Sequence, residues 1–417
     1  MRYKKDNRMK FYRNIFVLAF LLLIQQNGCA QVKSSVNPNS VTDTVFPLMA
    51  WDYVNSEKVL NDMQQCGINL VAFVEPDFLD ACHKYGIRGV IYDEELSGVI
   101  FSSYNSSTAN PVIKRLISTY NNHPALYGYH LKDEPQIEEL PELAKSIELV
   151  KRLAPGKWPY VNLFPTQVFG DNYESYLDQF GRICKPTAYS YDNYVEDYVV
   201  GDGQKSFFWK NLEQVRSASL KYELPFWNCI LTAPHWDYSL VTDANLRIRI
   251  FASLVYGAKG LSYYKFISAS LPILSAPDLG NFRGGPLDQF GERTPTWDLL
   301  RNMNRQIQNI GKTLLKLRSV EVYHFGSIPE GCRGVMDHCL LKNVPYGEFV
   351  VGDFIHEDGS SYVMIVNKSL DKSHPVMPEL RDSSKKIKMI SAWKGELEDF
   401  NNFFWLASGQ GVLLKLE

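Results

Sequence analysis

The chain has 417 residues, of which 45% are hydrophobic and 22% are charged, and its formal net charge is −2. A slightly acidic net charge gives no overall attraction to a nucleic-acid backbone, so the composition argues against a nucleic-acid-binding protein. The length exceeds what one ordinary hydrophobic core serves, so we expect a large domain accompanied by a smaller one.

The first 28 residues have the pattern of a secretory signal peptide. Six basic residues precede the apolar run Ile15–Ile24, which is followed by Gln25-Gln26-Asn27-Gly28-Cys29. A membrane-spanning helix needs about 20 apolar residues, so this shorter run suits a signal peptide better. Removing residues 1–28 takes away six of the 44 basic and one of the 46 acidic residues, so the net charge becomes −7. A polysaccharide of neutral sugars is compatible with that charge, and an anionic one requires a local basic patch.

The pair Gly28-Cys29 resembles the cleavage site of bacterial lipoproteins, in which the cysteine is lipidated and becomes the new N-terminus. The sequence departs from that pattern at Gln26, where an aliphatic residue is usual. The resemblance implies an exported protein held in the cell envelope, at either face of the outer membrane, by a lipid on Cys29 alone. Residues 29–42 are polar and unpatterned, as in a flexible tether. Ordinary secretion, with Cys29 incidental, is the alternative.

From residue 43 onward, short apolar segments alternate with helical ones, which indicates βαβ units and a parallel sheet. Eight such repeats within about 270 residues match a closed (β/α)8 TIM barrel better than an open sheet. No GxGxxG motif follows the first strand, so a dinucleotide-binding fold has no support. We therefore predict a catalytic α/β barrel over residues 43–317. The predicted strands are Phe46–Trp51, Asn69–Val74, Gly89–Tyr92, Leu126–Leu131, Tyr160–Phe164, Ala188–Tyr191, Pro225–Leu231 and Gly260–Phe266. The predicted helices are Ser56–Cys66, Pro76–Tyr85, Pro111–Asn121, Leu140–Leu153, Trp209–Lys221, Asp243–Tyr256 and Pro295–Lys316.

The last hundred residues have a different periodicity. A Gly/Pro-rich insert, Pro272–Arg293, follows the eighth strand and is expected at the mouth of the barrel. Residues 318–417 then alternate apolar and polar positions, which predicts a small antiparallel β-sandwich. Its expected role is to pack against the barrel, with carbohydrate binding as the alternative. The predicted strands are Gly347–Phe354, Ser361–Asn367, Lys386–Trp393 and Gly411–Leu416.

Six cysteines remain after Cys29, and none has the CxxC or His/Cys spacing typical of zinc sites. The sequence therefore predicts no metal and no cofactor. Cys332 and Cys339 lie close together in an exported chain, so they form either a disulfide or two free thiols. The other four are expected to be buried as small apolar side chains: Cys66, Cys82, Cys184 and Cys229.

The strongest catalytic signal is Asp133-Glu134-Pro135, at the end of the fourth predicted strand. The carboxyl ends of barrel strands face the active site. Glycoside hydrolysis needs a carboxylic acid to protonate the leaving oxygen and a second carboxylate as nucleophile or base. We assign Glu134 as the general acid, with Asp133 beside it. The alternative is that both acids merely cap the following helix.

Asp192, at the end of the sixth predicted strand, is the leading second carboxylate. Its alternative roles are binding a sugar hydroxyl or holding Lys132. The separation of the two carboxyl groups decides the mechanism: about 5–5.5 Å in retaining enzymes and about 6.5–9.5 Å in inverting ones.

Aromatic and polar side chains near the predicted strand ends are candidates for sugar binding. Aromatic rings stack on the C–H faces of sugars, but they also fill cores, so packing is the alternative for each. Tyr264 and Lys265 are neighbours in one strand, so at most one of them is expected to face the barrel axis. The candidates are Trp51, Asp52, Asp93, Glu95, His130, Lys132, Tyr191, Trp227, Asn228, His235, Trp236, Tyr264 and Lys265.

The run GYHLKDEP, at residues 128–135, resembles the end of the fourth strand in the clan of barrel glycosidases that includes β-galactosidases and agarases. In that clan the glutamate is the acid/base. The runs at 256–266 and 293–314 and the terminal VLLKLE resemble glycosidase-like lipoproteins of gut Bacteroidetes. The resemblance covers nearly the whole chain after the signal peptide and implies a (β/α)8 barrel of hydrolase ancestry.

One departure from the clan concerns the seventh strand. Retaining members carry their nucleophilic glutamate at its end, whereas residues 224–237 contain no glutamate and the nearest acid is Asp237. Our first hypothesis is therefore a glycoside hydrolase acting on an oligo- or polysaccharide at the cell envelope. The second is a catalytically inactive barrel that binds glycans at the cell surface, and the third is a structural envelope protein. The sugar, the linkage and the oligomeric state stay open.

Overall fold

The computed structural model describes residues 45–54, 56–96, 102–268, 281–401 and 404–417. The predicted signal peptide, the tether, Cys29 and part of the insert 272–293 lie outside these residues. Within the described ranges, no helix is both long enough and apolar enough to cross a bilayer.

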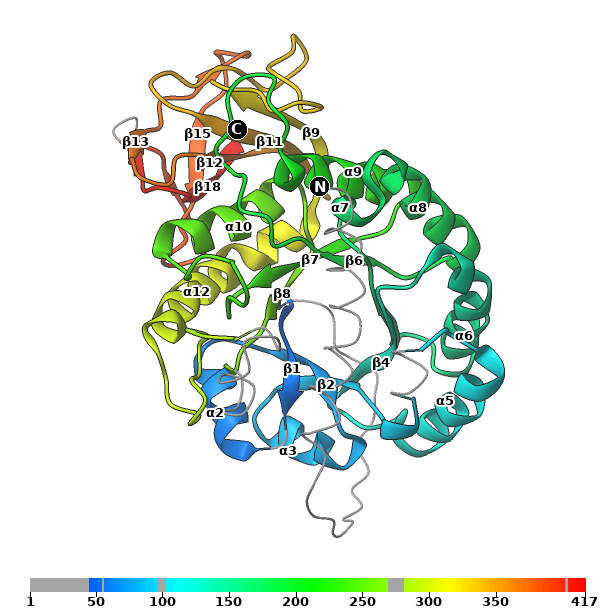
Figure 1. The fold of residues 1–417 in the computed structure, drawn as a ribbon. Coiled ribbons are helices and arrows are strands. Elements are labelled where there is room, and N and C mark those ends of the chain that lie inside the picture. Colours follow the sequence, from blue (N-terminus) through cyan, green and yellow to red (C-terminus); the bar gives the residue numbers. More distant parts are fainter. Residues whose placement is uncertain (1–44, 55, 97–101, 269–280, 402–403) are drawn as a thin grey trace.

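Eight parallel strands form the barrel, in the order β5-β4-β3-β2-β1-β8-β7-β6. A parallel bridge between Leu163 and Tyr191 joins the two ends of this order, so the sheet closes on itself (Figure 1). The predicted barrel is thus confirmed. The strands are β1 (Leu48–Val54), β2 (Leu70–Val74), β3 (Arg88–Ile91), β4 (Leu126–Asp133), β5 (Trp158–Asn162), β6 (Tyr189–Asp192), β7 (Phe226–Leu231) and β8 (Gly260–Tyr264).

Helices cover the outside of the barrel. The predicted helix Pro111–Asn121 begins five residues earlier, at Ser106, because the side chain of Asn105 accepts a hydrogen bond from the Ser107 amide and caps it. Helices α7 and α8 were not predicted. The helices are α2 (Glu57–Gln65), α3 (Leu79–Lys84), α5 (Ser106–Tyr120), α6 (Leu140–Leu153), α7 (Thr166–Phe169), α8 (Tyr173–Gln179), α9 (Phe207–Tyr222), α10 (Asp243–Val255) and α12 (Pro295–Lys316). Short helical turns are η1 (Pro76–Phe78), η2 (Ile137–Glu139), η3 (Gly170–Asn172) and η4 (Phe180–Cys184).

The C-terminal part forms the predicted antiparallel β-structure, with a six-stranded sheet in the order β16-β15-β18-β12-β11-β9. Its first strand, β9, was not predicted. Two short pairs, β10–β14 and β13–β17, complete it. The strands are β9 (Leu317–Phe325), β10 (Leu341–Asn343), β11 (Phe349–His356), β12 (Ser361–Asn367), β13 (His374–Pro375), β14 (Glu379–Leu380), β15 (Ile387–Ile390), β16 (Leu397–Asp399), β17 (Trp405–Leu406) and β18 (Gly411–Leu416).

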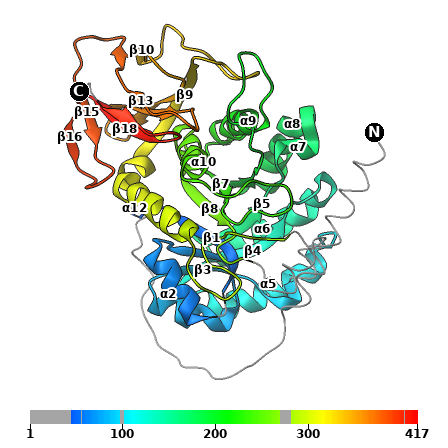
Figure 2. The same cartoon turned by 60° about the vertical axis from the view of Figure 1, so that its left-hand side comes forward.

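The two faces of the six-stranded sheet bury different cores. Val350 and Met364 join the hydrophobic core of the barrel, whereas their neighbours Val351 and Val363 join a second, smaller core. This alternation follows from the two-residue period of a strand. Figure 2 shows the sheet packed beside α10 and α12. At Gly352 a Cβ atom would lie 2.3 Å from the carbonyl oxygen of Val255, at the end of α10. The sheet therefore packs directly on the helical layer.

The cysteines have the predicted environments. The four in the barrel are buried, and Cys332 and Cys339 are free thiols, so the disulfide alternative is not realised.

Candidate active site

Three carboxylates lie at the carboxyl end of the barrel. Asp133 and Asp192 are the last residues of β4 and β6, and Glu134 directly follows β4. All three side chains are partly exposed. Glu134 has a positive φ of 48°, and its amide donates a 2.8 Å hydrogen bond to the carbonyl of Asn162. A residue other than glycine with this backbone conformation is uncommon, and such residues concentrate at functional sites.

Asn162, the last residue of β5, connects two of the acids. Its Nδ2 lies 3.4 Å from Oδ1 of Asp133 and 3.4 Å from Oδ1 of Asp192. The two oxygens are therefore separated by no more than twice that distance. The hydroxyl of Ser190 donates to Oδ1 of Asn162 at 3.0 Å, which directs the NH2 group toward the acids. One amide thus positions the carboxylates of β4 and β6.

The environment of the three acids separates their proton affinities. Burial raises each pKa, and repulsion from Asp192 raises those of Asp133 and Glu134 further. The pKa of Asp133 rises to about 7 and that of Asp192 to about 6. Hydrogen bonds from Tyr194 and Asn162 limit the rise at Asp192, whereas the pKa of Glu134 lies well above its ordinary value. The pKa of Asp192 therefore rises less than that of Asp133, and raised carboxyl pKa values at one site are what a general acid requires.

Aromatic rings flank these acids. The ring of Tyr264 lies parallel to that of Tyr194, with centroids 5.6 Å apart, and meets Trp51 edge-on at 5.2 Å. Burial raises the pKa of Tyr264, and the nearby charges of Asp52, Asp133 and Asp192 add to it. Tyr264 therefore lies close to carboxylates from three different strands, with its side chain largely buried.

A second group of rings lies next to Tyr264, and together with Trp51, Tyr194 and Tyr264 it forms what we call the aromatic wall. His235 stacks on Phe282 with centroids 4.5 Å apart and contacts Trp236 at 4.4 Å. Burial lowers the pKa of His235 to about 4, so its imidazole is neutral at neutral pH. A neutral imidazole both donates and accepts hydrogen bonds, as sugar hydroxyls require.

Asp52 and Lys265 form an ion pair near the same wall. Lys265 Nζ lies 3.8 Å from Oδ1 of Asp52 and 5.4 Å from the ring centroid of Phe282. Tyr264 also contacts Phe282, at 5.7 Å. Strand β8 ends at Tyr264, and the side chains of both Tyr264 and Lys265 contact Phe282. That at most one of them faces the barrel axis stays a prediction.

The side chains of Tyr191 and Asn228 point out of the barrel, toward the surrounding helices, contrary to the predicted sugar-binding role. Ser190 points to the barrel axis, so the next residue, Tyr191, points to the helices, and its register partner Asn228 does the same. Asn228 Nδ2 donates to Oγ of Ser253 in α10 at 2.9 Å, and Tyr191 is 1% exposed. Strand alternation, which the sequence alone could not anchor, decides both positions.

Trp227 lies at the opposite end of the barrel from the acids. It is the second residue of β7, pairs in register with Gly260, and its ring packs 4.7 Å from that of Trp158. A Cβ at Gly260 would lie 2.3 Å from the Trp227 ring, so the indole fills the space that the glycine leaves. The predicted stacking role of Trp227 is therefore wrong, since the amino ends of strands lie far from the active-site face.

Four further candidates are occupied by contacts within the protein. Asp93 and Glu95 both form 3.2 Å ion pairs with Arg115 on the outer helix α5. Lys132 pairs with Glu139 at 3.1 Å and not with Asp192, and it also donates to the carbonyl of Ser102. His130 is 0% exposed between Phe73 and Tyr160, and burial lowers its pKa to about 3. The side chains of Lys132 and His130 are therefore buried within the protein, whereas that of Glu95 is largely exposed.

Sequence reasoning missed Asn162, Tyr194, Tyr160 and Phe282. Strand β5 ends at Asn162 and not at Phe164. Because the predicted strand ended two residues too late, Asn162 was not recognised as a residue at the strand end. Tyr160 accepts a hydrogen bond from Nε1 of Trp51 at 2.8 Å and so holds that indole in place. Phe282 comes from the Gly/Pro-rich insert, whose position at the mouth was the one available signal.

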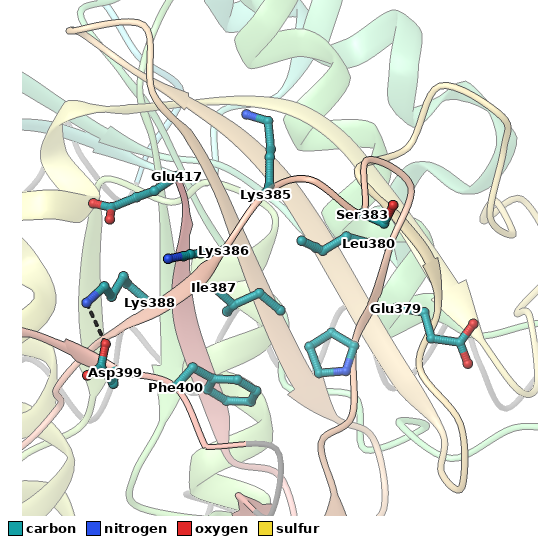
Figure 3. A pocket seen from close by; sticks show the side chains of 11 residues that line it. Glu379, Leu380, Ser383, Lys385, Lys386, Ile387, Lys388, Asp399, Phe400 and Glu417 are labelled. Atoms are coloured by element: carbon teal, nitrogen blue, oxygen red, sulfur yellow. Dashed lines mark hydrogen bonds and ion pairs between the residues drawn. The ribbon is translucent and has the colours of Figure 1, made fainter.

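A separate hollow of about 880 Å³ lies on the small domain. Figure 3 shows the side chains that line it. Lys385 and Lys386 line it beside an ion pair of 2.5 Å between Lys388 and Asp399. Among the described residues that line it, Phe400 alone has an aromatic ring. Its lining offers neither a convergent carboxylate pair nor an aromatic wall, so the mouth of the barrel is the better candidate for catalysis.

The raised pKa of Asp133 leads us to predict how the free energy of unfolding depends on pH. Its pKa of about 7 exceeds its ordinary value of 3.8, so between about pH 4 and 7 the folded state binds more protons than the unfolded state. The free energy of unfolding therefore falls as pH rises through this window. We expect Asp133→Asn to flatten that slope and to stabilise the fold at pH 8 by roughly 1–4 kcal/mol. Urea unfolding at pH 5 and 8 measures both values, and an unchanged slope in the variant contradicts the assignment.

Comparison with known proteins supports the fold. No protein-family model and no curated protein matches the sequence. Among solved structures, a glycoside hydrolase family 5 protein from Bacteroides vulgatus is 14% identical, with a TM-score of 0.54 over 89% of each chain. A second structure, described as a glycoside hydrolase, has the same identity and TM-score over 89% of this chain and 92% of its own. The chain thus shares the overall architecture of barrel glycosidases at low sequence identity.

Proposed function

We propose that the protein is a glycoside hydrolase that acts on an oligo- or polysaccharide. The observation that carries the proposal is the set of three carboxylates at the barrel mouth, where burial and mutual repulsion raise the pKa of Glu134 well above its ordinary value and that of Asp192 rises to about 6. The aromatic wall of Trp51, Tyr194 and Tyr264 beside them supports a sugar substrate.

The mechanism that best fits these residues is inverting hydrolysis. Glu134 donates its proton to the glycosidic oxygen as that bond breaks, and Asp192 accepts a proton from the water that attacks the anomeric carbon. Strand β7 ends at Leu231 and is followed by Thr232, Ala233 and Pro234, so it offers no carboxylate nucleophile for a retaining route. Asn162 positions Asp192 for the water.

The stereochemistry of the product tests this mechanism. We expect the first-formed sugar to have the opposite anomeric configuration to the substrate, as read by proton NMR in the first minutes of hydrolysis. Asp192→Asn removes the base and is expected to lower kcat by about 10²–10⁴-fold, because general bases contribute that much. Retention of configuration, or an Asp192→Asn variant with ordinary kcat, overturns the inverting assignment.

A second candidate function is glycan capture without cleavage, which the absence of an acid at the end of β7 favours. In that case the wild-type protein binds glycans but releases no reducing ends. Binding then persists in Glu134→Gln and weakens when Tyr264 is replaced by alanine. Reducing-end release from the same glycan distinguishes the two functions.

We also propose that the protein is exported and anchored through a lipid on Cys29. The signal-peptide pattern of residues 1–28 supports this proposal. Cys29→Ser is expected to move the protein from the membrane fraction to the soluble fraction of producing cells. A protein that stays in the soluble fraction with Cys29 intact contradicts the anchor.

A further inference from the structure

A second cluster of reactive side chains lies outside the barrel mouth, where the barrel meets the small domain. Glu213 is on α9, His324 is on β9, and Cys332 is in the loop after β9. One ligand atom from each of these residues lies within 4.8 Å of the other two. In the part of the chain that the structure describes, this is the one such grouping of three His, Cys, Asp or Glu side chains.

A fourth oxygen completes the cluster. The hydroxyl of Tyr256, directly after α10, lies 3.0 Å from Oε1 of Glu213, 3.2 Å from Nε2 of His324 and 4.0 Å from Sγ of Cys332. In a tetrahedral zinc site with bonds of 2.0–2.3 Å, neighbouring ligand atoms are roughly 3.3–3.8 Å apart. The three distances from the Tyr256 oxygen lie within a few tenths of an ångström of this range. The other three donor atoms lie within 4.8 Å of one another and would draw together around a bound ion.

The surrounding structure holds these groups in place before any ion binds. The indole of Trp209, which is fully buried, meets the His324 ring edge-on at 5.2 Å and lies 6.2 Å from the ring of Tyr256. The amide of His324 donates to the carbonyl of Arg333 at 2.8 Å, which fixes the loop that carries Cys332 beside β9. His324 itself is 1% exposed, and its Nδ1 has no hydrogen-bond partner within the protein. The other ring nitrogen, Nε2, is the one that faces the Tyr256 hydroxyl and the cluster.

The donor set selects the metal by chemistry. A set of one sulfur, one imidazole nitrogen and two oxygens suits the borderline-soft ion Zn²⁺, whereas Mg²⁺ and Ca²⁺ prefer oxygen ligands at higher coordination number. We propose that Glu213, His324 and Cys332, with the Tyr256 oxygen, bind one zinc ion that fastens the small domain to the barrel. Binding displaces the thiol proton of Cys332 to solvent, because the thiolate is the ligand.

Metal analysis of the purified protein tests this site and does not depend on enzymatic activity. After exposure to Zn²⁺ and gel filtration, we expect one zinc per chain by mass spectrometry. With Co²⁺ as the probe, we expect a thiolate-to-cobalt charge-transfer band in the near ultraviolet. Cys332→Ser should abolish the band and weaken zinc binding by more than about 100-fold, since even residues behind the ligands change affinity 10–100-fold. Glu213→Gln, which keeps the shape of the side chain, should weaken zinc binding while the cobalt band persists.

Cys339→Ser is the matched control, because Cys339 is a buried free thiol in the same domain but belongs to the small second core. It should keep both the zinc and the cobalt band. Wild-type protein that takes up no zinc, shows no cobalt band and gains no thermal stability with Zn²⁺ overturns the proposal without reference to any variant. Zinc that stays bound in Cys332→Ser and is lost in Cys339→Ser overturns it as well.

Discussion

Replacing Glu134 with glutamine is expected to lower kcat by about 10²–10⁴-fold, the usual contribution of a general acid. The amide has nearly the shape of the carboxyl group but has no acidic proton to give to the leaving oxygen. The free energy of unfolding should not fall, because the substitution removes a group that Asp133 and Asp192 repel when it is charged. Steady-state kinetics on the best natural glycan, together with urea unfolding, measure both effects.

The leaving group of the substrate provides an internal check on this assignment. An activated aryl glycoside needs little protonation, so Glu134→Gln should lose much less activity on it than on the natural glycan. Glu95→Gln is the matched control, because Glu95 pairs with Arg115 on the outer helix and should leave kcat unchanged. Ordinary activity of Glu134→Gln on the natural glycan would remove Glu134 from the mechanism.

The second large effect concerns stability and comes from Trp227. Its indole is 4% exposed and packs against Trp158 and Gly260 at the closed end of the barrel. Truncating a buried tryptophan leaves a cavity, so Trp227→Ala should lower the free energy of unfolding by about 3–5 kcal/mol. Denaturant unfolding measures this loss.

Trp236 is the matched comparison, because it is a partly exposed tryptophan on the loop that follows the same strand. Trp236→Ala should change stability little and should raise KM for the glycan, since its ring contacts His235 on the mouth wall. If Trp227→Ala instead raises KM and leaves the unfolding curve unchanged, the placement of Trp227 in the barrel core is wrong.

The sequence predicted the barrel because its strands are nearly continuous apolar runs separated by amphipathic helices, a pattern that few other folds produce. It also located Asp133, Glu134 and Asp192, because acids that directly follow apolar strands stand out. The sequence could not show which of Tyr191 and Asp192 faces the barrel axis. The two-residue period of a strand says that neighbours point in opposite directions, but not which of them points inward. The hydrogen bond from Ser190 to Asn162, which only the structure shows, fixes Ser190 as an inward-facing residue.

The proposed zinc ligands show a second reason why the sequence alone could not predict every site. His324 and Cys332 are separated by seven residues, whereas Glu213 on α9 and Tyr256, directly after α10, lie far upstream. No local spacing rule brings such positions together, so the sequence predicted no metal. The packing of the small domain on the barrel creates the cluster. Strand β9 was also concealed, because its alternation begins at Leu317, immediately after the last helical residue of α12.

Strand β9 begins directly after the last residue of α12, and this limits how the two domains can be separated in evolution. There is no linker at which the barrel could be cut from the small domain, and Arg216 of α9 donates hydrogen bonds to Ser319 and Val320 across the junction. Ten of the 13 residues of α10 are buried, partly by the six-stranded sheet. A barrel excised after residue 316 would expose that helix to water. We therefore expect the pair to be inherited as one unit, with substrate range diversifying through the mouth loops and not by exchange of the C-terminal half.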